Sequence, residues 1–189
     1  MLADRIRSIP VVGATYSTWS PTDKGGSVDL SNGNRTAAAR SLNSVRGSQA
    51  RSSGKYQFEI TISGTTPVAS LLGVATSAAS LTNYPGSGTG GWAYYASDGH
   101  FYNQGSDAAY GSSFTAGDVI GVVVDFSAGT LKFYKNGVDQ GVAYSGTAGK
   151  TLYPIFGSGS SSSVNAYTGT INTGQSSFSY PVSGASAWG

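Results

Sequence analysis

The stretch from residue 117 to residue 141 constrains the fold of this chain more than any other segment. Apolar side chains recur at every second position from Ile120 to Phe126, so they share one face of an extended strand. A Ser-Ala-Gly turn follows, and Asn136-Gly137 marks a second tight turn, because a type I′ hairpin needs positive φ at both central residues. The segment therefore predicts three consecutive antiparallel strands with one face committed to a core.

Shorter alternating segments, separated by turns rich in glycine, serine and asparagine, fill the rest of the chain. Residues 55–63 alternate without a break, which predicts that Tyr56, Phe58, Ile60 and Ile62 face the core and that Lys55, Gln57, Glu59 and Thr61 face solvent. Further strands are predicted at residues 28–31, 35–40, 71–76, 92–96, 100–103, 151–156 and 164–167. Loops are expected at residues 77–90 and 105–116. We predict an all-β fold, a two-sheet antiparallel β-sandwich.

A single domain accounts for the chain length of 189 residues, since all-β sandwiches often reach this size undivided. No internal repeat is present, so we expect residues 15–189 to form one domain. Residues 1–14 are interpreted either as an N-terminal arm that docks to a neighbour or as an edge strand of the sandwich. They lack the apolar core of a signal peptide, and no segment approaches the ~18 apolar residues of a membrane span. We therefore expect no membrane insertion and a protein made soluble in a cytoplasm.

The charge pattern narrows the classes of partner. Charged residues make up 11% of the chain, the formal net charge is +2, and the eleven lysines and arginines form no basic run. This pattern argues against nucleic acid as a partner. The chain has no cysteine, which excludes disulfides and thiol-metal sites. The expected surface is neutral and rich in hydroxyl groups.

Candidate catalytic groups are sparse. His100 is the only histidine; a triad with Asp98 or Asp107 is formally possible, but no Gly-x-Ser-x-Gly elbow accompanies it. Glu59 is the only glutamate and has no acidic neighbour two or four residues away, as the paired carboxylates of related glucanases would require. The aspartates are scattered without the spacing of an EF-hand. We predict no enzymatic activity, no catalytic residues, no cofactor and no metal site.

Several motifs resemble those of one known family. Gly-Asp-x-Ile-Gly at residues 117–121, Leu-x-Phe-Tyr-Lys-Asn-Gly at 131–137, Gly-Val-Ala-Tyr at 141–144 and Leu-Tyr-Pro at 152–154 resemble the central signature of SPRY domains. The closing stretch at residues 172–181 resembles that of SPRY chains from tailed phages, although Thr173 departs from the pattern. The resemblance covers about residues 15–184. It implies a concanavalin-like sandwich that binds a peptide or protein through loops at one end.

The resemblance also implies a location for the binding surface. Tyr102 aligns with a hairpin tyrosine that SPRY domains often present beside their ligand groove, and residues 158–163 match another wall of that groove. The family often has Trp-Gly in this wall, where this chain has serines. Residues 35–43 are also too polar for a core and carry few charges. The predicted binding residues are Arg35, Asn43, Tyr102, Ser158, Ser160 and Ser163.

Two functions are compatible with these features. Our main interpretation is a virion protein of a tailed phage, either a capsid decoration protein or a tail-fibre or receptor-binding head. It would attach through its loops to other virion proteins or to a glycan or protein of the host surface, as a monomer or a homo-oligomer. The alternative is an intracellular SPRY adaptor that binds a peptide or a protein partner.

Overall fold

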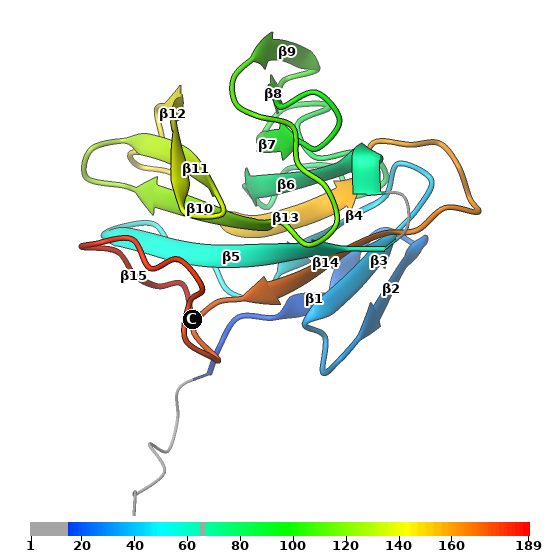
Figure 1. Ribbon diagram of the computed structural model, residues 1–189, viewed down its shortest axis with the longest axis horizontal. Coiled ribbons are helices and arrows are strands. Elements are labelled where there is room, and N and C mark those ends of the chain that lie inside the picture. Colours follow the sequence, from blue (N-terminus) through cyan, green and yellow to red (C-terminus); the bar gives the residue numbers. More distant parts are fainter. Residues whose placement is uncertain (1–14, 65–66) are drawn as a thin grey trace, which may run out of the picture.

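Two antiparallel β-sheets packed face to face form the body of the molecule (Figure 1). The computed structural model describes residues 15–64 and 67–189. One short 3-10 helix, Pro67–Ala69, precedes β6. The predicted all-β, two-sheet sandwich is confirmed, whereas the proposed arm or edge strand at residues 1–14 lies outside the described residues.

Within the described residues, the first sheet has seven strands and the second has eight. In spatial order the first contains β1 (Trp19–Lys24), β4 (Ser44–Gly47), β13 (Tyr153–Ser158), β6 (Ser70–Ala75), β7 (Gly91–Tyr95), β8 (His100–Asn103) and β9 (Ser106–Ala109). The second contains β12 (Val138–Ser145), β11 (Thr130–Lys135), β10 (Val119–Asp125), β5 (Lys55–Ser63), β14 (Tyr167–Asn172), β3 (Thr36–Ala39) and β2 (Val28–Ser31). The short strand β15 (Ser186–Ala187) joins it by parallel pairing with β5.

The predicted meander is present as β10, β11 and β12. Val122 on β10 lies opposite Phe133 on β11, and both side chains are fully buried. Asn136 and Gly137 have φ of 49° and 82°, the positive values that the hairpin between β11 and β12 requires. The period of two in this segment therefore reflects one face packed against the opposite sheet.

Aromatic and branched aliphatic side chains from both sheets fill the space between them. Phe58, Ile60 and Ile62 on β5 are fully buried, as predicted, and they share the core with Trp19, Tyr94 and Phe156. Burying this apolar surface supplies the main driving force for folding.

Several predicted strands are shifted by one or two residues, and two predicted segments differ more clearly from the structure. The segment predicted as a loop at residues 105–116 begins with strand β9, which pairs with β8 at the edge of the first sheet. The strand predicted at residues 164–167 begins only at Tyr167 and continues to Asn172. β14 pairs with β5 and β3, and it alternates buried Tyr167, Gly169 and Ile171 with the more exposed residues between them.

The C-terminal segment covers part of the outer face of the second sheet (Figure 1). Gln57 and Glu59, predicted to face solvent, are only 1% and 2% exposed. The Glu59 carboxylate accepts hydrogen bonds from the backbone N–H groups of Ser179 and Tyr180, at 2.9 and 2.7 Å. Gln57 accepts one from the N–H of Val182 at 2.7 Å. Both side chains point outward as predicted, but the returning chain buries them, and hydrogen bonds offset the cost of burying a charge.

Candidate functional site

A pocket of about 200 Å³ opens on the outer face of the first sheet. It is lined by Leu71, Tyr84, Tyr95, Tyr102 and Gly159, and we call it the tyrosine pocket. These residues come from β6, the loop between β6 and β7, β7, β8 and the loop after β13. Four consecutive segments and one loop that is distant from them in the sequence therefore build one site.

Strand alternation places the floor and one wall of the tyrosine pocket. Leu72 and Val74 on β6 point into the core, so Leu71, which precedes Leu72 on the same strand, points to the outer face. Leu71 lies opposite Tyr95 on β7, and facing cross-strand residues have side chains on the same side of a sheet. An apolar floor and an aromatic wall thus follow from strand register.

The Tyr102 ring stands nearly at right angles to the two other tyrosine rings of the pocket. The Tyr102 ring lies 5.4 Å from that of Tyr95 at an interplanar angle of 82°, and 6.0 Å from that of Tyr84 at 89°. Edge-to-face contacts of this kind are favourable beyond the area they bury. The tyrosine pocket therefore has walls that hold one another in place and present aromatic surfaces in different directions.

Glycine at position 159 keeps the tyrosine pocket open. Its N–H donates to the carbonyl of Ala69 at 2.7 Å, which holds the loop against the sheet. A Cβ atom at this position would come within 2.7 Å of Leu71 Cδ1 and 3.3 Å of Tyr95 Cε2. A larger side chain there would consequently occupy the space between the floor and the wall.

Comparison with known proteins identifies the family. The family model for the SPRY domain matches residues 55–175. The chain belongs to the SPRY family. It is 26% identical to the SPRY domain of human HERC1, whose crystal structure aligns with a TM-score of 0.70 over 84% of this chain and 99% of that one. The predicted family and its sandwich are confirmed.

Two curated relatives contain a similar segment. The Ran-binding proteins 9/10 homolog of Drosophila melanogaster is 32% identical over 150 residues, which cover 74% of this chain and 16% of that protein. The E3 ubiquitin-protein ligase RKP of Arabidopsis thaliana is 35% identical over 134 residues, which cover 69% of this chain and 10% of that protein. The chain thus spans a sixth or less of the length of these two relatives. Nothing in these comparisons indicates a phage protein.

The SPRY domain brings some of the predicted binding residues together. Tyr102 lines the tyrosine pocket, and Ser158 and Ser160 flank Gly159. The N–H of Ser158 donates to the carbonyl of Asn43 at 3.0 Å, so the loop after β3 lies beside the loop after β13. Ser163 is exposed further along the same loop. Five of the six predicted residues therefore belong to one connected region.

Three of the six predicted residues do not offer a side chain to a ligand at the tyrosine pocket. Arg35 precedes β3 while Asn43 follows it, so Arg35 lies at the opposite end of that strand, hydrogen-bonded to Asn32. Ser158 is fully buried, and its hydroxyl bonds to the backbone of Ser160. The Asn43 amide donates to the carbonyl of Ser41 at 2.8 Å. Ser158 and Asn43 shape the loops rather than offering free groups to a ligand.

Tyr84, Tyr95 and Leu71 were not among the predicted site residues, and Gly159 was included only as part of the predicted wall at residues 158–163. The loop at residues 77–90 has the length of a functional segment, and Tyr84 is its aromatic residue. A Cβ atom on Gly86 would lie 2.6 Å from the Tyr102 carbonyl oxygen, so glycine lets this loop approach β8. That contact places Tyr84 beside Tyr102, and only the folded chain reveals it.

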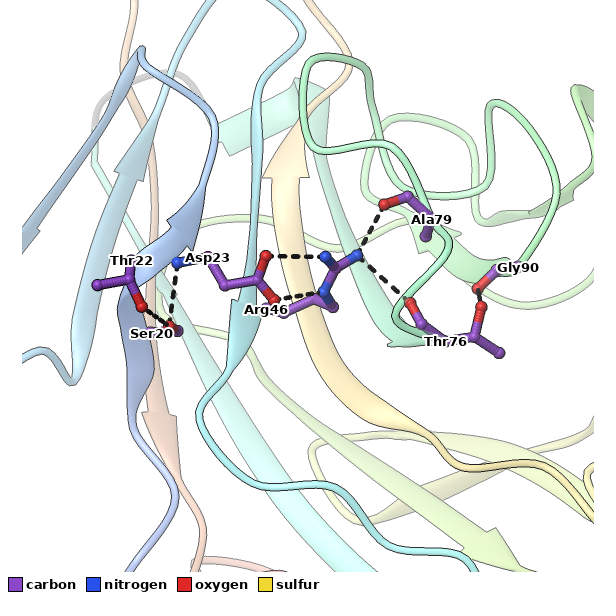
Figure 2. Close-up of polar contacts among 7 residues, drawn as sticks. All are labelled: Ser20, Thr22, Asp23, Arg46, Thr76, Ala79 and Gly90. Atoms are coloured by element: carbon purple, nitrogen blue, oxygen red, sulfur yellow. Dashed lines mark hydrogen bonds and ion pairs between the residues drawn. The ribbon is translucent and has the colours of Figure 1, made fainter.

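A buried arginine fixes the base of the Tyr84 loop (Figure 2). Arg46 on β4, with a side chain only 7% exposed, forms a two-pronged ion pair with Asp23 on β1 at 2.7 and 2.8 Å. Its Nη1 donates to the carbonyls of Thr76 and Ala79, at 3.3 and 2.7 Å. Thr76 in turn donates its N–H to the carbonyl of Gly90 at 2.8 Å, which closes the loop. Arg46 thereby ties the edge strand β1 to the loop that carries Tyr84.

Acidic side chains stand beside the tyrosines. Burial, reinforced by the charges of Asp107 and Asp98, raises the pKa of Tyr102 above its usual range. Burial and the charge of Asp98 likewise raise the pKa of Tyr95. Both phenols are therefore neutral at physiological pH. In the described residues, no three histidine, aspartate or glutamate side chains gather as a metal site. No helix in that part of the chain is long and apolar enough to cross a membrane.

His100 is expected to titrate above its ordinary pKa of 6.5, chiefly because Nδ1 hydrogen-bonds to Asp107 at 2.6 Å. The contact favours folding most below the unfolded pKa, and its contribution disappears as the pH rises through the raised folded pKa. In an NMR titration, Asp107→Asn should lower the pKa of His100 clearly. Asp98→Asn is the matched control and should lower it less, because Asp98 Oδ2 lies 4.0 Å away. A wild-type pKa at or below 6.5 would contradict this interpretation.

Proposed function

We propose that this SPRY domain is a non-enzymatic adaptor module that binds a segment of a partner protein in the tyrosine pocket. The observation that carries the proposal is the open pocket itself, where three tyrosines, with the Tyr102 ring nearly perpendicular to the other two, surround the apolar floor of Leu71. Tyrosine presents a large, rigid contact area with few rotatable bonds, so ordering it on binding costs little entropy. The neutral phenol groups can also donate to and accept from a peptide backbone.

The loops around the tyrosine pocket suit an extended peptide. Hydrogen bonds hold the loop after β13 to both neighbours: Leu42 donates its N–H to the Ser160 carbonyl at 2.8 Å, and Gly159 donates to Ala69. Gly105 donates its N–H to the carbonyl of Gly86 at 2.9 Å on the opposite rim. A site whose walls are already fixed loses little freedom when a ligand binds.

The names of the relatives favour the adaptor interpretation over the virion interpretation. Ran-binding proteins and a ubiquitin ligase are named for contacts with other proteins, and each contains this segment as a small part of a longer chain. The capsid, tail-fibre and host-glycan assignments receive no support from them. We propose that the partner is an intracellular protein, without nucleic acid, and that no cofactor takes part.

Filling the tyrosine pocket should weaken peptide binding without unfolding the domain. Peptides selected from a random library on the wild-type chain serve as probes, and their affinities are measured by calorimetry. Gly159→Leu is expected to weaken binding about tenfold or more, equivalent to ~1.4 kcal/mol, because the new side chain occupies the site. Folding should be little affected, since Leu71 Cδ1 is the end of a flexible side chain and Gly159 has no positive φ.

The matched control is Gly26→Leu, at an exposed glycine with open space around the position of its Cβ atom. This variant should bind the selected peptides as the wild type does. Recovery of no peptide, or of peptides that bind Gly159→Leu as tightly as the wild type, would refute the proposed site.

A further inference from the structure

We infer that the tyrosine pocket selects a cationic side chain, a lysine or methylated lysine, of the bound segment. The inference rests on the proposed function, since it names the group that the partner inserts. It is carried by three features of the described residues: ring geometry, the distribution of charge around the site and the size of the pocket.

Ring geometry is the first feature. A cation is attracted to the face of an aromatic ring when it lies within about 6 Å of the ring centroid. The Tyr102 ring is 5.4 Å from that of Tyr95 and 6.0 Å from that of Tyr84, and all three line one pocket. Because the angles of 82° and 89° turn the rings in different directions, a single group in the pocket can meet more than one aromatic surface. The Tyr102 ring, nearly perpendicular to both of its neighbours, forms with them an aromatic cage.

The distribution of charge is the second feature. Residues 67–116, which supply four of the five lining residues, contain no lysine or arginine, but they contain Asp98 and Asp107. Asp107 on β9 lies directly opposite Tyr102 on β8, so their side chains are neighbours on the outer face. Asp98 lies in the turn before β8. Both carboxylates are about 40% exposed and can attract a cation to the rim of the pocket.

His100 lies close to both carboxylates and, when protonated, reduces their net negative charge. Its Nδ1 is 2.6 Å from Asp107 and 4.0 Å from Asp98, and it is the charged group on β8 that faces both. When His100 is protonated, its positive charge offsets part of the negative rim. Cation binding should therefore strengthen as the pH rises through the raised pKa of His100.

The size of the pocket is the third feature. Its volume of about 200 Å³ is below the ~300–1,000 Å³ usual for sites that hold drug-sized ligands or cofactors. A single long side chain can enter, with its methylene groups against Leu71 and its charged end among the rings. Gly159 leaves this entry open.

The test uses the full chain, labelled with ¹⁵N, and follows the backbone amides of Tyr84, Tyr102 and Gly159. The probes are N-acetyl-lysine amide, N-acetyl-trimethyl-lysine amide and the neutral isostere of the latter, in which carbon replaces the ammonium nitrogen. At least one cationic probe is expected to bind roughly 5- to 30-fold more tightly than the neutral isostere. Equal binding of the cations and the isostere, or no shift at the pocket amides, would overturn the inference.

Matched variants test whether the preference for a cation comes from the aromatic ring or only from the volume of the side chain. Tyr102→Phe keeps the ring and should retain the preference for the cation, whereas Tyr102→Leu should remove most of it. Tyr84→Leu, on a loop outside the strands, provides a second test should the Tyr102 variant fold poorly. Asp107→Asn should reduce the preference while the isostere binds unchanged. A preference that survives both leucine substitutions would also overturn the inference.

The two proposals fail in distinguishable ways. If selected peptides lose affinity for Gly159→Leu but carry no basic residue, and the cationic probes show no preference, the protein-binding site stands and the cation cage is wrong. If selected peptides bind outside the tyrosine pocket, the proposed function fails, whatever the result with the lysine and trimethyl-lysine probes.

Discussion

Replacing Trp188 by alanine is expected to destabilise the domain by about 3–5 kcal/mol, a large share of the ~5–15 kcal/mol typical of a folded protein. Trp188 directly follows the short strand β15 and is fully buried. Its ring packs edge-on against Phe58 at 5.2 Å and lies 6.1 Å from Tyr56. Its indole N–H donates to the carbonyl of Gln49 at 3.0 Å. Alanine would leave a cavity in the core and an unpaired carbonyl.

Thermal unfolding provides the measurement. At ~2–4 °C per kcal/mol for a chain of this size, the melting temperature should fall by roughly 6–20 °C. Trp188→Phe keeps much of the packing and loses the indole hydrogen bond. Its melting temperature should therefore lie between those of the wild type and Trp188→Ala. Ser186→Ala, at an exposed position on β15, is the control and should change little. A Trp188→Ala variant that melts like the wild type would show that the C-terminal segment does not complete the core.

Replacing Arg46 by methionine is expected to destabilise the domain by about 3 kcal/mol, the lower end of the range for breaking a buried ion pair. The lower end applies because Asp23 is 42% exposed and can be rehydrated. The carbonyls of Thr76 and Ala79 would also lose a donor. Arg46→Lys should restore only part of the stability, since an ammonium group cannot reproduce the two-pronged contact.

Hydrogen exchange distinguishes the anchoring of the Tyr84 loop by Arg46 from a general loss of stability. In Arg46→Met, the amides of residues 76–90 should exchange faster than those of the meander at residues 119–145, because the base of the Tyr84 loop has lost its anchor. Asp23→Asn should produce a weaker form of the same pattern. Uniform acceleration across both sheets would mean that Arg46 stabilises the sandwich without positioning the loop.

Local alternation was sufficient to predict the central part of the fold. In β5 and β10 the side chains that face the core are apolar at every second position, so their burial could be inferred from the sequence. The same rule assigned Glu59 to solvent, because the sequence does not show that residues 179 and 180 return to its carboxylate. Contacts made by the returning chain depend on long-range folding and lie outside any local pattern.

The binding site could be predicted only in part, because it too depends on contacts between segments that local patterns do not show. Tyr102 was identified because a family motif placed it beside a groove, but its partners Tyr84 and Tyr95 come from a loop and a neighbouring strand. Ser158 was expected to contact a partner because it is polar, whereas the fold buries it within its own loop. The family resemblance identified the sandwich, while the phage assignment rested on terminal motifs that the relatives do not support.

The most direct test of the account locates a selected peptide on the domain by intermolecular nuclear Overhauser effects. The account predicts contacts between the peptide and the ring protons of Tyr84, Tyr95 and Tyr102, together with loss of those contacts in Gly159→Leu. A second hollow, lined by Lys55, Val123, Asp125, Thr130, Lys132 and Tyr134, provides the competing location on the other sheet. Contacts confined to that hollow, with none to the three tyrosines, would contradict the central claim.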